Sequence, residues 1–424
     1  MQPVTAKKPF FGWFIVIASI VTFGIAVGVP YYNLPFFYDY FQKSYGWRLD
    51  QITLGFPLAA LLTIWVGPIL IPRFSPRKLI LAGTAATAVA LCGFGLMGGS
   101  IFVYFLFWFI YTVGYLFSGP IPHQILVSYW FRKKRGMAMG LVYVGVGLFG
   151  ALGAKFVKPL TEAYGFHAAL VVLGLLMFLT WPLAFFVLRD KPGEKGLFPD
   201  GLATPPPDLK LKPHSYGALL KSWPFWLLLI GSIASIGSIG SINFHMKFVF
   251  RDEGFTSQTA LNSVWSTAQF WILISSIVGR LSIGYFADVF SKKWVMTATY
   301  FIVAATIPLL LMVRPPKDPI FFALVFGFAM GADYMLIPLM AAEQFGVNTL
   351  ARAMAIILPA NTIGQTWIPQ LVSIMREHYG SYQTPMAWVF GLAILGAIAI
   401  AILPRYTPLV EPAGSIERTT STQA

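Results

Sequence analysis

One arginine, Arg280, lies inside a long apolar part of the sequence. It follows the run 270–278, and Asp288 comes eight residues later. In a helix those eight residues separate the two side chains by about 12 Å along the axis. A guanidinium stays charged when buried and binds a carboxylate through two hydrogen bonds. Because a buried permanent cation needs an anion, the sequence favours Arg280 as the anchor of an anionic substrate. The alternative is a gate contact with Asp288.

An acidic residue, Asp333, lies well inside another apolar run, 320–340. We expect it to approach Arg280 and to neutralise the empty site, because opposite charges stabilise each other where water is excluded. Substrate or a proton would then release the pair, which makes Asp333 the candidate for proton coupling. The alternatives are a permanent structural pair and helix packing.

Uncharged polar side chains in other apolar runs could complete a binding site. We expect Tyr31, His123, Tyr334 and Asn361 to shape the pocket around Arg280. The alternative for each is a hydrogen bond between helices. We find no Walker, HExxH or GxSxG motif and no group of histidines with metal-ligand spacing. We therefore expect no cofactor, no metal and no enzymatic activity.

The elements that must hold these residues are membrane-spanning helices. Of the 424 residues, 57% are hydrophobic and only 11% are charged, whereas soluble domains have about 25% charged residues. A helix needs roughly 20 apolar residues to cross the bilayer, and no run alternates as barrel strands do. We predict twelve spans: Phe11–Phe37, Ile52–Ile71, Leu79–Met97, Phe102–Val127, Met137–Val157, Ala168–Val187, Trp226–Phe248, Thr259–Phe286, Trp294–Val313, Ile320–Met340, Ala353–Met375 and Ala387–Leu403.

The distribution of Lys and Arg predicts the orientation. Most of them fall between spans on the side that holds both termini, which predicts a multi-pass protein of the cell membrane with cytoplasmic termini. This topology accounts for much of the net charge of +14, so we expect no nucleic-acid partner. The partners expected are a small organic anion, protons and the lipid bilayer.

A polar, proline-containing stretch divides the twelve spans into two sets of six. Its composition is typical of an extended linker. We predict a six-helix bundle at 1–189, a cytoplasmic linker at 190–222, a second bundle at 223–405 and a cytoplasmic tail at 406–424.

Each half also repeats a pattern after its second span, in which glycines precede a basic end. The copies run from Gly67 to Arg77-Lys78 and from Gly279 to Lys292-Lys293. Within these copies we expect an inner gate formed by Arg77, Gly279, Asp288 and Lys292.

This repeat resembles the loop signature of the major facilitator superfamily, although the first copy has Arg73 where the family usually has Asp. The resemblance implies an all-α membrane protein whose twelve transmembrane helices form two pseudo-symmetric six-helix bundles around one cavity. The segment Tyr129-Trp130-Phe131-Arg132-Lys133-Lys134-Arg135-Gly136 is similar to the signature of the monocarboxylate porters, and Gly12-Trp13 is similar to the pair that opens their first helix. Arg280 matches the family's eighth-helix arginine, which contacts the substrate carboxylate.

Three departures from these families limit the expected mechanism. Animal members have an acid where this chain has Ser276 and a lysine where it has Tyr31. This leaves Asp333 or the substrate as proton carrier. The related bacterial oxalate–formate exchangers use a second cation in the eleventh helix, and 353–375 has none. We therefore expect proton-coupled symport of small monocarboxylates such as lactate or pyruvate by alternating access. The alternatives are an oxalate/formate-type exchanger and a non-transporting membrane sensor. A monomer is compatible with each of these three functions.

Overall fold

The computed structural model describes residues 10–202, 204 and 213–404, and all regular structure among them is helical. Lipid offers no partner to backbone amides and carbonyls, so apolar spans satisfy these groups internally as helices. Among the described residues, nine helical stretches are long and apolar enough to cross a membrane. A pair of helices, Gln51–Leu62 and Val66–Arg73, bent by 43°, counts as a tenth span if the two are taken together. One stretch, Arg135–Phe186, turns at Gly165 and holds two spans. With the more polar α17 (Leu350–Tyr379) the predicted twelve are present.

The N-terminal half consists of irregular helices broken at glycine and proline. The first span is α1 (Gly12–Phe23), a π-helical turn (Gly24–Gly28), α2 (Val29–Asn33), a 3-10 turn (Leu34–Phe37) and α3 (Tyr38–Tyr45). The others are α4 (Leu49–Thr53), α5 (Gly55–Leu62) and α6 (Val66–Leu70), then α7 (Pro76–Leu96), then α8 (Ile101–Ser118) with α9 (Pro120–Trp130), then α10 (Arg135–Leu176) with α11 (Thr180–Phe186).

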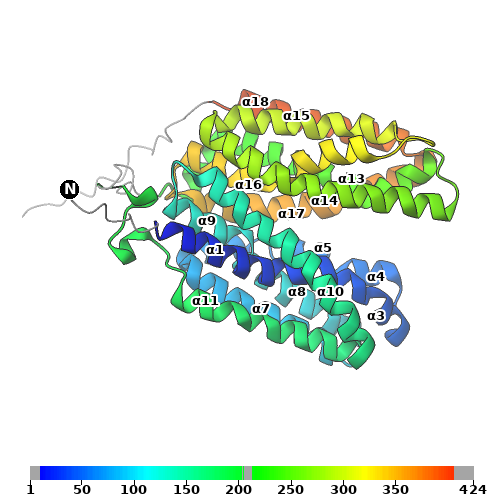
Figure 1. Ribbon diagram of the computed structural model, residues 1–424, viewed down its shortest axis with the longest axis horizontal. Helices are drawn as coiled ribbons and strands as arrows, with labels where there is room; N and C mark the ends of the chain where they lie inside the picture. The colour runs from blue at the N-terminus through cyan, green and yellow to red at the C-terminus, as the bar shows by residue number, and fades with distance from the viewer. Residues whose placement is uncertain (1–9, 203, 205–212, 405–424) are drawn as a thin grey trace, which may run out of the picture.

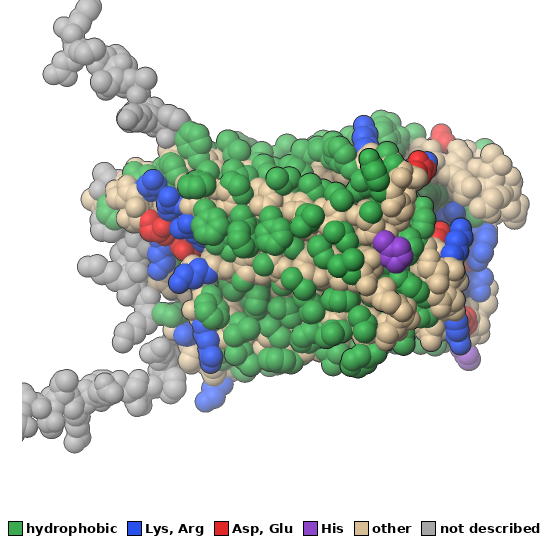
Figure 2. Space-filling model, turned by 90° about the horizontal axis from the view of Figure 1, so that it is seen from below, with side chains coloured by type: hydrophobic (Ala, Val, Ile, Leu, Met, Phe, Trp, Pro, Cys, Tyr) green, Lys and Arg blue, Asp and Glu red, His purple; other side chains and the backbone are tan. Residues whose placement is uncertain are grey.

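In the C-terminal half each of the six spans is one continuous helix. They are α13 (Trp223–Asp252), α14 (Gln258–Val289), α15 (Lys292–Leu311), α16 (Ile320–Phe345), α17 and α18 (Gln383–Ile402), preceded by the short α12 (Tyr216–Lys221). Figure 1 shows the two halves as neighbouring bundles with their helices roughly parallel. Figure 2 shows a broad apolar belt with Lys, Arg, Asp and Glu gathered at its two ends, as a membrane-embedded surface requires.

The linker between the halves is folded where the structure describes it. Residues 192–195 and 199–201 form 3-10 turns against the N-terminal half. The Asp200 carboxylate accepts hydrogen bonds from the amides of Arg132 and Lys133, at 3.0 and 2.9 Å. The sequence predicted an extended linker, and these turns differ from that prediction. Pro192 and Pro199 are buried, and their burial holds the turns in place. The predicted tail, 406–424, lies outside the described residues. We call the end of the molecule that carries the linker the linker end, and the opposite end the far end.

Candidate functional site

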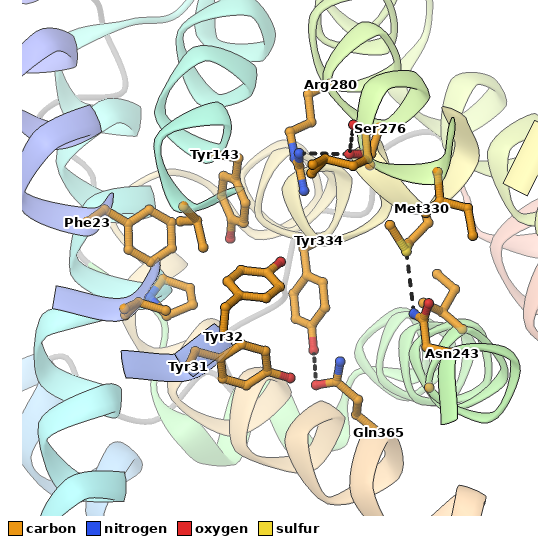
Figure 3. Close-up of a pocket in the computed structure, with 18 of the residues that line it drawn as sticks. Phe23, Tyr31, Tyr32, Tyr143, Asn243, Ser276, Arg280, Met330, Tyr334 and Gln365 are labelled. Carbon is orange, nitrogen blue, oxygen red and sulfur yellow. Dashed lines mark hydrogen bonds between the residues drawn. The ribbon is translucent and has the colours of Figure 1, made fainter. Parts of the chain in front are cut away.

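A cavity of about 370 Å³ lies between the two halves. Helices of both halves supply its walls: α1, α2, α8, α9 and α10 from the first, and α13, α14, α16 and α17 from the second. Arg280 is the one charged side chain among its described lining residues. Figure 3 shows its guanidinium pointing from α14 into the cavity, on the same side as Tyr143 of α10.

The guanidinium of Arg280 is buried and only partly bonded. Arg280 is 9% exposed, its Nη1 donates to Ser276 Oγ at 3.1 Å, and its Nε has no partner among the described residues. Gly147 of α10 lies beside it, since a Cβ at that position would be in ordinary van der Waals contact with Nη1, at 3.6 Å. No described carboxylate lies within ion-pair distance of Arg280. A buried cation with open donors favours an anionic partner, since its desolvation cost is offset when an anion binds.

Two of the residues expected to shape the pocket, Tyr31 and Tyr334, lie in the wall of this cavity. The π-helical turn at Gly24–Gly28 precedes Tyr31 and its neighbour Tyr32, and turns of this kind are common at functional sites. The first span approaches α10 closely there, because a Cβ on Gly28 would collide with the carbonyl of Val146. The irregular first span thus brings two tyrosines to the cavity wall.

Two of the expected pocket residues, His123 and Asn361, do not line the cavity. His123 is fully buried behind Phe23, with ring centroids 4.9 Å apart. Its Nδ1 is 2.8 Å from the carbonyl of Gly119 and its Nε2 is 2.9 Å from Thr22 Oγ1, so both ring nitrogens are satisfied. Asn361 accepts a hydrogen bond from Ser232 at 2.9 Å. Both residues join helices inside their own half.

The expected pair of Asp333 with Arg280 is not formed. Asp333 is fully buried in α16, and its Oδ1 accepts a hydrogen bond from Ser235 of α13 at 3.1 Å. Its neighbour Tyr334 faces the cavity instead. Successive helical residues point about 100° apart, so one of the two turns toward α13 and the other toward the cavity.

Several lining residues were not singled out from the sequence. Tyr115 and Tyr143 both line the cavity. Ser276 also lines it; the sequence singled it out only as a departure from related families, although it precedes Arg280 by four residues and therefore shares its helix face. The tyrosines carry no comparable signal, since an apolar span contains many aromatic residues that face lipid or core.

Asp288 joins the two halves at the linker end. Its Oδ1 and Oδ2 accept hydrogen bonds from the backbone amides of Gly136 and Met137, at 2.6 and 2.8 Å. These amides belong to the first turn of α10, where the helix dipole also favours a negative charge. Glycines make the approach possible, because a Cβ on Gly284 would lie 2.7 Å from the Gly136 carbonyl oxygen.

The other three predicted gate residues act within one half. Gly279 packs directly on the backbone of Phe328 in α16, and Lys292 pairs with Glu343 at 3.0 Å. Arg77 donates to the carbonyls of Ala184 and Phe185, both at 2.8 Å. Of these four residues, Asp288 is the one whose side chain hydrogen-bonds to a described residue of the opposite half.

Arg77→Ala should therefore lower stability without altering the gate. Two charge-assisted hydrogen bonds join α7 to α11, and we expect their loss to cost roughly 1–2 kcal/mol, since the side chain is partly exposed. Thermal unfolding of the purified variant measures this. An unchanged melting temperature would contradict the structural role of Arg77. A change in the accessibility of the cavity would indicate that Arg77 takes part in gating.

The linker supplies a second connection between the halves. Tyr216 donates to the carbonyl of Pro68 in the N-terminal half at 2.5 Å. Arg352 of α17 donates to the carbonyl of His214, also at 2.5 Å, and its guanidinium lies 6.0 Å from the Tyr216 ring. Together with the bonds of Asp288, these bonds join the two halves at the linker end.

Known proteins resemble this chain over most of its length. The family model described as Major Facilitator Superfamily matches residues 13–282. Human monocarboxylate transporter 10 is 22% identical over 352 residues, which cover 78% of this chain but only 64% of that protein. The oxalate:formate antiporter of Oxalobacter formigenes is 22% identical over 407 residues, which cover 93% of this chain and 92% of that protein.

Solved structures share the fold at low sequence identity. The transporter FucP in its outward conformation superimposes with a TM-score of 0.69 at 15% identity, over 92% of this chain and 98% of FucP. The human organic anion transporter MFSD10 superimposes with a TM-score of 0.70 at 12% identity. The match covers 93% of this chain and 100% of MFSD10.

Proposed function

The chain belongs to the Major Facilitator Superfamily, and we propose that it is a secondary active transporter that carries small monocarboxylates together with protons. Arg280 supports this proposal most directly. It offers open hydrogen-bond donors to a cavity between two bundles, and no described carboxylate pairs with it. A carboxylate entering the cavity would replace lost hydration by two charge-assisted bonds. We place the protein in the cell membrane with both termini in the cytoplasm, as the positive-inside rule favours.

Binding and gating can be coupled through α14. Arg280 and Asp288 are eight residues apart on this helix, about 12 Å along its axis. A tilt of α14 on substrate binding would therefore act on the bonds from Asp288 to Gly136 and Met137. Alternating access follows if these bonds and those of the linker break when the linker end opens.

Anion exchange of the oxalate/formate type is the second candidate. The similarity to the Oxalobacter antiporter favours it. Against a dianion stands the single cation among the described lining residues, because two carboxylates would leave one uncompensated charge in the cavity.

Uptake by proteoliposomes separates the two candidates. Symport predicts that labelled lactate accumulates when the inside is made alkaline, with no anion inside. Exchange predicts uptake that ignores the gradient and requires an internal anion. If neither lactate nor pyruvate, formate or oxalate enters under either condition, the proposal of small organic anions fails.

Asp333 is our candidate for the proton site. It has no described cation within ion-pair distance, and an isolated charge in a water-free interior is costly, so binding a proton is favoured. Asp333→Asn keeps the shape of the protonated side chain but cannot release a proton. We expect lactate exchange to persist and pH-driven accumulation to fall at least tenfold.

The matched control is Asp252→Asn, at the far end, where Asp252 pairs with Arg376 at 3.0 Å. This variant should accumulate lactate as the unmodified chain does. Full pH-driven accumulation by Asp333→Asn would exclude Asp333 as the coupling residue and leave the substrate as the proton carrier.

A further inference from the structure

We propose that the preferred substrate is a monocarboxylate that carries a flat ring with an uncharged hydrogen-bonding group at its distal end, and that it has no ammonium group. This rests on the proposed function, because Arg280 is taken to bind the carboxylate.

The cavity is much longer than a three-carbon acid. Along α14 its lining extends from Arg280 to Gln269. Those eleven residues correspond to about 16 Å of helix. A volume of about 370 Å³ also falls in the range, roughly 300–1,000 Å³, that encloses ligands larger than lactate. A small acid held at Arg280 would leave most of the space to water.

The walls of the cavity are unusually rich in aromatic rings. Seven line it: Phe23, Tyr31, Tyr32, Tyr115, Tyr143, Phe244 and Tyr334. Tyr31 lies edge-on to Tyr32, with centroids 5.4 Å apart, and stacks on Tyr115 at 6.3 Å. Rings at such angles present both faces and edges to the cavity, and these surfaces bind a flat aromatic group better than a branched or strongly hydrated one.

Uncharged amides provide polar contacts away from Arg280. Gln365 of α17 accepts a hydrogen bond from Tyr334 at 2.6 Å through Oε1, and its Nε2 has no hydrogen bond to any described residue. Asn243 of α13 donates only to the weak acceptor Met330 Sδ, at 3.4 Å. Figure 3 shows Gln365 across the cavity from Arg280, with the Tyr334 ring between them. A hydroxyl or carbonyl on the distal end of a ring could satisfy the free amide groups.

The charges exclude amino acids as preferred substrates. No Asp or Glu is among the described residues that line the cavity, and Asp333 turns toward Ser235. An ammonium group next to the carboxylate would approach the guanidinium of Arg280 without a counter-charge. The cavity therefore selects against zwitterions.

Equilibrium binding to the purified full chain tests this selection. We expect 4-hydroxyphenylacetate to bind at least tenfold more tightly than lactate and several-fold more tightly than phenylacetate, and tyrosine not to compete. Gln365→Met should remove the advantage of the hydroxyl and weaken phenylacetate binding much less. The control Gln258→Met, on the exposed first turn of α14, should bind all the acids normally.

A second variant, Tyr31→Leu, should weaken the binding of both ring acids more than the binding of lactate. Lactate binding as tightly as the ring acids, tyrosine binding as well as 4-hydroxyphenylacetate, or Gln365→Met weakening every acid equally would each overturn the inference. In those cases the acids still bind and the proposed function stands. Binding of none of the acids would overturn both.

Discussion

Arg280→Lys should abolish pH-driven accumulation of lactate in proteoliposomes and weaken carboxylate binding at least tenfold. Lysine keeps the charge but replaces a planar fork of donors by a single ammonium group, so a bidentate contact is lost. A hydrogen bond to a charged group contributes about 1.5–3 kcal/mol, which corresponds to roughly ten- to hundredfold in affinity. Lysine also cannot reach Ser276 in the same way, which removes the bond that now orients the guanidinium.

Arg376→Lys is the matched control for this variant. Arg376 forms an ion pair with Asp252 at the far end, outside the cavity. It should transport normally, because lysine can keep that surface pair and surface pairs contribute little. If Arg280→Lys transports as well as Arg376→Lys does, Arg280 is not the anchor of the substrate.

Asp288→Ala should shift the protein toward a state that is open at the linker end. The variant loses two charge-assisted hydrogen bonds between the halves and leaves the amides of Gly136 and Met137 without their carboxylate. At roughly 1.5–3 kcal/mol per charged bond, the equilibrium between the two states should move at least tenfold. The reporter is a cysteine placed at Val146 in the cavity, in a chain whose Cys92 is replaced by serine. An impermeant thiol reagent added on the linker side should react with it at least tenfold faster.

Asp200→Ala controls for the loss of a carboxylate near the same turn. Asp200 accepts hydrogen bonds from Arg132 and Lys133, but it belongs to the part of the linker that packs on the N-terminal half. Its removal should leave the labelling rate at Val146 unchanged. Equal rates in the two variants would mean that Asp288 does not hold the linker end closed.

The spans and the burial of Arg280 could be predicted from the sequence, because both depend on strong local energies. Long apolar runs must be helical in lipid, and a buried arginine is too costly to occur without a role. The faces of the helices could not be predicted. Most spans are apolar all round, so periodicity does not show which side meets the cavity. Asp333 and Tyr334 illustrate this, since both are polar neighbours and only Tyr334 lines the cavity.

The contacts of Asp288 illustrate a second limit of the sequence. The repeated pattern of glycines followed by basic residues predicted contacts at the linker end. The partners of Asp288 are two backbone amides, and because every residue except proline has such an amide, the sequence could not identify them. The role of His123 was equally hidden. A histidine inside a span predicts a functional group, but the carbonyl of Gly119 and the hydroxyl of Thr22 satisfy both of its nitrogens.

We propose that the cavity recognises a negative charge through Arg280. The most direct measurement compares acids with their uncharged amides on the purified chain, using lactate with lactamide and phenylacetate with phenylacetamide. Our account predicts that the acids bind, that the amides bind at least tenfold more weakly, and that Arg280→Lys removes the difference. Equal binding of acid and amide, or a preference for the acid that persists in Arg280→Lys, would contradict it.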